Sequence, residues 1–283
     1  MNKYAGLLCL SSLSIALLSA CGGGSSKDNN SQRTTQNTAV DSAKKPDVAQ
    51  VVNSYIQPAS LVDNSDIHSY RIAMIGNSHT SGLARTLKKT IETMVPGKSV
   101  DVQVLGSGFT DDLIRNYDVV MGFTQPQTRW THLIIQGQKY SQSQSQDYST
   151  TATEQWVAMA RTHGATPVLF PEHAQRGNST EGSYVYGIHK VIASSEPSCI
   201  APVARAWSKA LSARPELELH DKDGNHANAV GALLSALVFT QIITGESVDK
   251  GPVTILAGVE PQIQGELGQH AAQALTERPG CPI

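Results

Sequence analysis

Two short polar segments, far apart in the sequence, contain residue types that together could transfer an acyl group. The segment Gly76-Asn77-Ser78-His79-Thr80 follows an apolar run and precedes a helical pattern. A serine at that point lies near a helix N-terminus, whose free N–H groups and positive dipole end favour a developing anion. The segment Asp223-Gly224-Asn225-His226 precedes the longest helical pattern. There a histidine could act as general base, with the aspartate holding its ring in the required tautomer.

Each of these segments also has a purely structural interpretation. Ser78 could simply cap the following helix, as serine often does, and Asp223 could cap a solvated turn. Asp221 is an alternative carboxylate and His220 an alternative base. Gly106-Ser107-Gly108 ends another strand-like run, where glycines could bring backbone N–H groups close to a ligand or form a plain tight turn. The chemical interpretation therefore requires a fold that brings these segments together.

Strand-like and helix-like segments alternate through most of the chain. Short apolar runs predict buried strands, and apolar residues at helical spacing predict amphipathic helices. The expected strands are 71–75, 100–104, 132–136, 167–170 and 200–203. The expected helices are 83–94, 150–163 and 227–244. Beyond them, 251–259 could add a strand and 261–277 could add a helix. This alternation predicts an α/β domain with a mainly parallel sheet of about five strands and helices on both faces. Active sites of such sheets lie at the carboxyl ends of the strands.

The combination of segments resembles the SGNH (GDSL-like) hydrolase superfamily, whose members are serine esterases with a flavodoxin-like, three-layer α/β/α fold. The first segment is similar to the first block of that family, with Asn77 where aspartate is usual. The second segment matches the last block, D-x-x-H. By this resemblance Ser78 is the nucleophile, His226 the base and Asp223 the third member of the triad, and no cofactor or metal is implied. The resemblance extends from residue 71 to about residue 245.

The same resemblance implies an oxyanion hole, and one of its donors departs from the family pattern. Gly106–Thr110 is similar to the second block, which implies the backbone N–H groups of Ser78 and Gly108 as donors. The third block of the family has Gly-x-Asn-Asp, and its asparagine donates to the oxyanion. Here the third strand pattern is followed by Gln-x-Gln instead. The resemblance therefore implies Gln138 as the third donor, with Gln136 as the alternative.

The composition restricts the class of protein. The chain has 283 residues, 16% of them charged, and a formal net charge of −2. It is long enough for one large globular domain, and it has no broad basic field that would attract nucleic acid. The histidines show no zinc-ligand spacing such as H-E-x-x-H. These features predict a globular protein with no nucleic-acid partner and no metal site.

The N-terminus is predicted to be a targeting signal rather than part of the fold. The apolar run 7–18 is shorter than the roughly 20 residues of a membrane-spanning helix, and Leu18-Ser19-Ala20-Cys21 closes it with small residues. This pattern resembles the bacterial lipoprotein signal, and an ordinary secretory signal is the alternative. The resemblance implies that residues 1–20 are removed and that Cys21 carries a lipid. Gly22 in the next position then implies an anchor in the outer membrane of the bacterial cell envelope.

Residues 21–66 are predicted to be a flexible tether, and residues 67–283 the hydrolase-like domain. The tether is rich in Gly, Ser, Thr, Asn and Gln. Such a segment cannot bury enough apolar surface to offset the entropy of ordering. Within it, 48–56 contains some apolar residues and could form a short helix docked on the domain.

Two further cysteines, Cys199 and Cys281, belong to the predicted domain. In an oxidising compartment two such cysteines often pair, which predicts a disulfide that holds the C-terminal tail. Two free thiols are the alternative.

Three functions fit these observations. The first is a serine esterase that removes a small acyl group, such as an O-acetyl group, from a small ester or an acylated glycan. The second is a lipolytic enzyme or thioesterase with room for longer acyl chains. The third is a non-catalytic binding lipoprotein that retains the fold. The triad residues favour the first two, and the altered third block favours the last.

Overall fold

A parallel sheet of five strands forms the centre of the part of the chain that the structure describes. The computed structural model describes residues 47–57, 59–254 and 256–281, so Cys21 and the predicted signal lie outside the described residues. The strands are β1 (Ser69–Gly76), β2 (Ser99–Ser107), β3 (His132–Ile135), β4 (Thr166–Leu169) and β5 (Cys199–Ile200). They stand in the order β2-β1-β3-β4-β5, and every neighbouring pair is parallel. This is the flavodoxin-like strand order, and it confirms the predicted α/β fold class.

The side chains of β1 show how the sheet separates two cores. Ile72 and Met74 belong to one hydrophobic cluster, and Ala73 and Ile75 belong to the other. All four are 0% exposed. Successive side chains of a strand point to opposite faces, so a strand that is apolar at every position must be covered on both sides.

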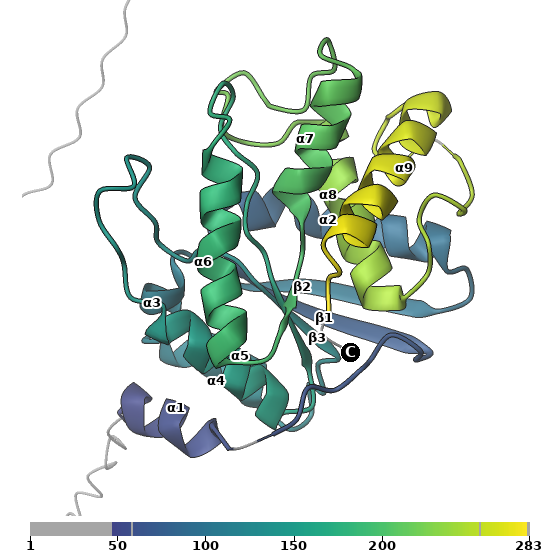
Figure 1. The fold of residues 1–283 in the computed structure, drawn as a ribbon. Coiled ribbons are helices and arrows are strands. Elements are labelled where there is room, and N and C mark those ends of the chain that lie inside the picture. The colour runs from purple at the N-terminus through teal and green to yellow at the C-terminus, as the bar shows by residue number, and fades with distance from the viewer. Residues whose placement is uncertain (1–46, 58, 255, 282–283) are drawn as a thin grey trace, which may run out of the picture. The chain divides into compact units, whose positions relative to one another are not determined.

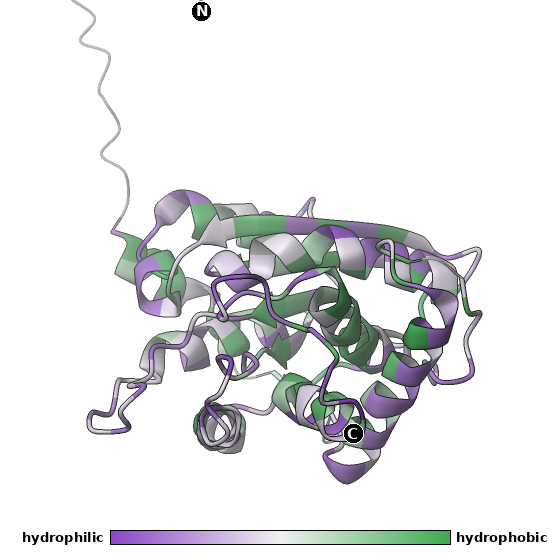
Figure 2. Cartoon of the chain, turned by 90° about the horizontal axis from the view of Figure 1, so that it is seen from above, coloured by the Kyte–Doolittle hydropathy of each residue, from purple (hydrophilic) through white to green (hydrophobic). Residues whose placement is uncertain are grey.

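One face of the sheet is covered by long helices from both halves of the chain. These are α2 (Ser78–Met94), α7 (Val203–Ala213), α8 (Ala229–Thr244) and α9 (Pro261–Glu277). Helix α8 lies among the other three and is buried almost all the way round, as expected for a helix without a polar face. Figure 1 shows these helices on one side of the sheet, and Figure 2 shows hydrophobic segments concentrated in the interior. The expected helices 83–94, 227–244 and 261–277 are confirmed.

The opposite face carries the other helices. These are α1 (Val48–Tyr55), α3 (Thr110–Leu113), α4 (Tyr117–Thr124), α5 (Thr151–Thr162) and α6 (Glu181–Ser195). Helix α1 packs against α4 and α5, and its Val52 is only 2% exposed. The short docked helix expected at 48–56 is therefore present.

The folded unit begins earlier in the chain than the predicted boundary at residue 66. The side-chain amide of Asn64 donates to the backbone carbonyls of Thr131, at 2.8 Å, and Gly164, at 3.0 Å. The backbone N–H of Gln57 donates to Thr162 Oγ1 at 2.9 Å. The polar residues of this segment thus bond to the domain, which composition alone cannot distinguish from a solvated tether. The tether remains a prediction for the residues before 47, which lie outside the described ones.

Two strand predictions near the C-terminus need correction. The strand expected at 200–203 is shortened to β5, because Pro202 has no N–H for a ladder and Val203 begins α7. The strand expected at 251–259 is wrong: among the described residues of that range there is only a single bridge, between Leu256 and Val259.

A disulfide joins Cys199 to Cys281. It ties the C-terminal end of the described chain to β5. The predicted disulfide is therefore present, and the alternative of two free thiols is wrong. None of the helices in the described ranges is long and apolar enough to cross a bilayer.

Candidate active site

Ser78 is the first residue of α2, directly after β1. Gly76 ends the strand with a φ of 152°, and a Cβ at this position would lie 2.3 Å from Thr80 Oγ1, so the turn requires glycine. Asn77 is the N-cap of α2, and its Oδ1 accepts the backbone N–H of His79 at 3.0 Å. The capping interpretation of Ser78 is therefore wrong, because the residue before it provides the cap.

The structure brings Ser78, His226 and Asp223 together across 148 residues of sequence. Ser78 Oγ lies 2.7 Å from His226 Nε2, and His226 Nδ1 lies 2.5 Å from Asp223 Oδ2. The His226 side chain is 38% exposed and the Asp223 side chain 49% exposed, so the group is open to solvent. The hydrogen bond from the His226 ring, with those from the backbone N–H groups of Asn225 and His226, holds the pKa of Asp223 well below its usual range. The three side chains thus have the contacts of nucleophile, base and orienting carboxylate.

The turn that carries His226 is built by the same aspartate. Asp223 Oδ1 accepts the backbone N–H groups of Asn225 and His226, both at 2.9 Å, while its Oδ2 faces the imidazole. Gly224 adopts a left-handed φ of 72°, and Asn228 then caps α8 through Val230 and Gly231. Asp223 therefore fixes both the backbone around His226 and the orientation of its ring.

The alternative acid and base make other contacts. His220 Nε2 lies 2.9 Å from the backbone carbonyl of Ala174. Asp221 Oδ1 accepts the backbone N–H of Lys222 at 2.7 Å. His226, by contrast, lies 2.7 Å from Ser78 Oγ and is itself held by Asp223, so the geometry favours Asp223 and His226.

The structure contradicts the predicted role of Gln138. Its Oε1 accepts from Thr153 Oγ1 at 2.7 Å, and its amide nitrogen donates to the backbone carbonyls of Lys139, at 2.9 Å, and Ser149, at 3.1 Å. Both amide protons are thus used inside the protein, where the side chain is only 6% exposed. Gln138 fixes the loop before α5 and has no proton left for an oxyanion.

The N–H of Gly108 is also used within the fold. It donates to the carbonyl of Gly76 at 2.9 Å and extends the ladder between β1 and β2. Gln136, the alternative donor, does lie beside the serine: its Oε1 accepts the backbone N–H of Asn77 at 2.6 Å, and its amide nitrogen donates to Glu172 Oε2 at 2.6 Å. An amide nitrogen carries two protons, so Gln136 has a second one to donate.

Comparisons with solved structures identify the architecture. No family model matches the sequence, and no curated protein matches it. A candidate SGNH hydrolase from Slackia heliotrinireducens superposes with a TM-score of 0.50 at 18% identity, over 62% of this chain and 98% of that one. The chain has the fold of SGNH hydrolases. A DUF4886 family protein from Bacteroides uniformis shares the fold with a TM-score of 0.59 at 14% identity, over 75% of this chain and 97% of that one.

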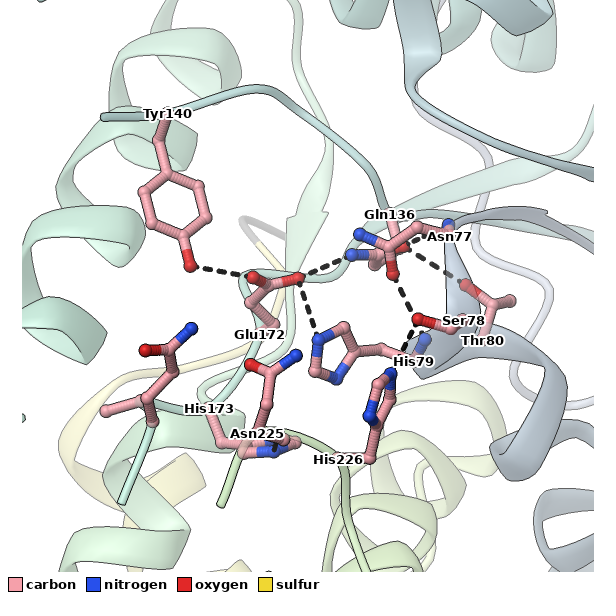
Figure 3. Close-up of polar contacts among 12 residues, drawn as sticks. Asn77, Ser78, His79, Thr80, Gln136, Tyr140, Glu172, His173, Asn225 and His226 are labelled. Atoms are coloured by element: carbon pink, nitrogen blue, oxygen red, sulfur yellow. Dashed lines mark hydrogen bonds and ion pairs between the residues drawn. The ribbon is translucent and has the colours of Figure 1, made fainter. Parts of the chain in front are cut away.

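Beside the serine of this SGNH fold lies a buried network that the sequence analysis did not predict. Figure 3 shows Glu172 between Tyr140 and His79. Glu172 Oε1 accepts from the Tyr140 hydroxyl at 2.8 Å, and Glu172 Oε2 lies 3.8 Å from His79 Nε2. The Tyr140 hydroxyl also lies 3.0 Å from Glu181 Oε1. Glu172 directly follows Pro171 after β4, so the rule that places sites at carboxyl ends of strands could have found it.

Histidine rings pack around His226 in this SGNH fold. The ring of His79 stacks on that of His226 and makes an edge contact with that of His173, which in turn stacks on Trp207 at 3.7 Å between centroids. Burial lowers the pKa of His79 below its usual value and that of His173 to about 3. Burial thus favours the neutral form of both rings, which limits their repulsion of a positive charge on His226. Within the described residues, no group of three or more His, Cys, Asp or Glu side chains could hold a metal ion.

Proposed function

We propose that the chain is a serine esterase that hydrolyses a small acyl ester through Ser78, His226 and Asp223. The observation that supports this most directly is the 2.7 Å contact between Ser78 Oγ and His226 Nε2, with His226 Nδ1 held by a carboxylate. A serine hydroxyl is a weak nucleophile until an adjacent base removes its proton. The contact supports this role for His226, because Nε2 lies within hydrogen-bond distance of the Ser78 hydroxyl.

The reaction follows from these contacts. His226 Nε2 takes the Oγ proton as Ser78 attacks the ester carbonyl carbon, and the carbonyl oxygen becomes an oxyanion. His226 then gives the proton to the alcohol oxygen, the bond from carbon to that oxygen breaks, and an acyl group remains on Ser78. Water, deprotonated by His226, attacks the acyl carbon and releases the acid. Asp223 stays charged and stabilises the imidazolium at each step.

The oxyanion is stabilised by donors near the start of α2. The N–H of Ser78 belongs to the first turn of that helix, where the dipole is positive. The second proton of the Gln136 amide is the side-chain donor next to it, in place of Gln138. Loss of one such donor typically lowers kcat by about 10²–10³.

Hydrolysis of p-nitrophenyl acetate, butyrate and octanoate by the purified full-length chain, beside Ser78→Ala, tests this proposal. We expect hydrolysis that Ser78→Ala abolishes, with the highest rate for acetate. A preference for octanoate would instead support the lipolytic alternative. Equal rates for the wild type and Ser78→Ala would overturn the serine mechanism.

A non-catalytic binding protein is the second candidate, and one observation favours it. The Gly108 N–H and both Gln138 amide protons are bonded within the fold, so two of the three expected oxyanion donors are occupied. A serine-directed fluorophosphonate probe distinguishes the two candidates. Labelling that disappears in Ser78→Ala and in His226→Ala supports the enzyme, and no labelling of the wild type supports the binding protein.

We further propose that the chain is a lipoprotein anchored through Cys21 in the outer membrane. The support is the sequence Leu18-Ser19-Ala20-Cys21 after an apolar run. Several acyl chains on one cysteine would anchor it stably, because each buried CH₂ contributes about 0.8 kcal/mol. Cys21→Ala should move the protein from the membrane fraction to the soluble fraction, and its persistence in membranes would exclude this anchor.

A further inference from the structure

A cavity of about 730 Å³ opens beside the triad and extends between α2 and α8. It is far larger than an acetyl group requires and falls in the range of small-ligand sites. Its residues come from the first turns of the two helices, the end of β4, the turn that carries His226, and the loop before α9, and they include Ser78, Gly82, Arg85, Thr86, Asp221, His226, Ala229 and Ala232. The described lining contains no residue of 106–110 or 136–140. The cavity therefore lies on the base side of Ser78, away from the loops that carry the expected oxyanion donors.

The chemistry of the base indicates which part of an ester this side receives. His226 Nε2 must give its proton to the alcohol oxygen when the acyl group is transferred to Ser78. The alcohol part must then lie next to His226, and the acyl carbonyl must point toward the oxyanion donors. Because His226 lines the cavity, the alcohol is the part of the substrate that can enter it.

Gly82 leaves the entrance to this cavity open. It stands four residues after Ser78 on α2, so the two share a helix face, and it is exposed. Its φ is not left-handed, and a Cβ built on it meets no atom within 4 Å, so neither the backbone nor packing requires glycine. A glycine inside a helix costs about 1 kcal/mol relative to alanine. In return for this cost, the missing side chain leaves open space in the cavity directly beside Ser78.

The lining of the cavity includes side chains that donate hydrogen bonds and side chains that accept them, beside apolar ones such as Leu83 and Phe170. Arg85 stands seven residues after Ser78, about 10 Å along the helix. It is exposed, and its side chain makes no hydrogen bond or ion pair with another described residue. Its guanidinium can only donate. The Asp221 carboxylate can only accept when charged, and the Thr86 hydroxyl can do both. An alkyl chain would offer these groups no hydrogen-bond partner, whereas a polyhydroxylated alcohol offers donors and acceptors to each of them.

We propose that this cavity is the subsite for the alcohol part of the substrate, that the alcohol is polyhydroxylated, and that Gly82 and Arg85 determine which alcohols are accepted. The proposal rests on the proposed esterase function and names its substrate class: an acyl ester of a sugar-like alcohol. Gly82 sets the width next to the nucleophile. Arg85 binds hydroxyl oxygens about two helical turns away.

Three acetyl esters that differ only in the alcohol test the proposal, with acetate release as the measurement: ethyl acetate, octyl acetate and methyl 6-O-acetylglucopyranoside. For the wild type we expect kcat/KM to be highest for the glucoside. Gly82→Leu should lower kcat/KM for the glucoside roughly tenfold more than kcat/KM for ethyl acetate, because the new side chain fills the entrance of the cavity. Arg85→Ala should raise KM for the glucoside roughly fivefold and leave kcat near its wild-type value. Gly187→Leu is the matched control, since Gly187 is also an exposed helical glycine with open space at its Cβ, but it lies outside the cavity.

The outcomes separate this proposal from the proposed function. If Ser78-dependent hydrolysis is found but Gly82→Leu affects all three esters equally, or octyl acetate is preferred, the esterase stands and the subsite is refuted. If no ester is hydrolysed, the esterase fails, and binding of methyl 6-O-acetylglucopyranoside, measured by saturation-transfer NMR, tests the subsite alone. Binding that Gly82→Leu removes and Gly187→Leu retains supports the subsite, and binding that is absent or unaffected by Gly82→Leu refutes it.

Discussion

The imidazole ring of His79 lies against that of His226, with 5.0 Å between the ring centroids and 28° between the planes. The His79 side chain is only 5% exposed, and its Nε2 faces Glu172 at 3.8 Å. One face of the proposed base is thus supported by a buried ring. His79, which follows the proposed nucleophile in sequence, therefore contributes to the position of the proposed base.

We predict that His79→Ala lowers kcat for p-nitrophenyl acetate by roughly 10²-fold with little change in KM, because a displacement of the base by about 1 Å has that effect. His79→Phe should recover most of the activity, since it restores a ring at the same place. Steady-state kinetics of both variants measures this. Equal activity of the two variants would show that the ring contact has no role.

Asp223 gives a second prediction. Asp223→Asn keeps an oxygen for the backbone N–H groups of Asn225 and His226, but it presents an amide to His226 Nδ1 and so favours the wrong tautomer. We expect kcat to fall by about 10⁴ with little loss of thermal stability. Asp147→Asn, at an exposed aspartate far along the chain, is the control for the loss of one charge. A decrease of less than tenfold in Asp223→Asn would exclude Asp223 from the triad.

The two glutamines after β3 should behave differently. Gln138→Leu removes the partner of Thr153 and two donors to backbone carbonyls, so we expect the free energy of unfolding to fall by about 1–3 kcal/mol while kcat changes little. Gln136→Leu should lower kcat by about 10² or more if its amide serves the oxyanion. Urea unfolding and kinetics on both variants measure the difference. The opposite result, with kcat lost in Gln138→Leu alone, would restore the family-like role of Gln138.

The buried His189 should lower the free energy of unfolding in acid. It is 2% exposed on α6, and burial lowers its pKa from the usual 6.5 to about 4. The unfolded chain therefore binds a proton that the folded one does not at pH values between these two, so stability is present above pH 6.5 and falls as the pH is lowered toward 4. One such group contributes about 1.4 kcal/mol per pH unit over that interval.

His189→Leu isolates this contribution. Urea unfolding measures the free energy of unfolding at pH 7.5 and at pH 5. Its decrease from pH 7.5 to pH 5 should be smaller in His189→Leu than in the wild type by about 2 kcal/mol. The residual loss arises from other buried histidines, such as His132 and His173, whose pKa values are lowered to about 3. An unchanged difference between the two pH values would mean that His189 is already protonated in the folded protein.

Much of the fold could be predicted because its signals are local. The run Arg71–Ile75 is apolar at nearly every position and ends at a glycine, and it forms β1. Pro96-Gly97 marks the end of α2, which the structure places at Met94. The contacts of Ser78 with His226 were also predictable, since both segments follow a pattern that the SGNH fold places at one edge of the sheet.

The features that were missed depend on side-chain directions. Nothing in the sequence shows that Gln138 points to Thr153, or that Tyr140 and Glu172 meet beside His79. These contacts depend on how the loops after β3 and β4 lie relative to each other. The hydrogen bonds of Asn64 could not be predicted either, because the composition of a polar segment is the same whether its side chains bond to water or to the domain.

The disulfide between Cys199 and Cys281 closes a covalent ring whose two ends are 82 residues apart in sequence. Asp223 and His226 lie inside this ring, and Ser78 lies outside it. A ring of that length removes about 4.5 kcal/mol of chain entropy from the unfolded state. Reduction would therefore lower the free energy of unfolding of the whole folded domain, and the turn that carries Asp223 and His226 would no longer lie within a covalently closed ring.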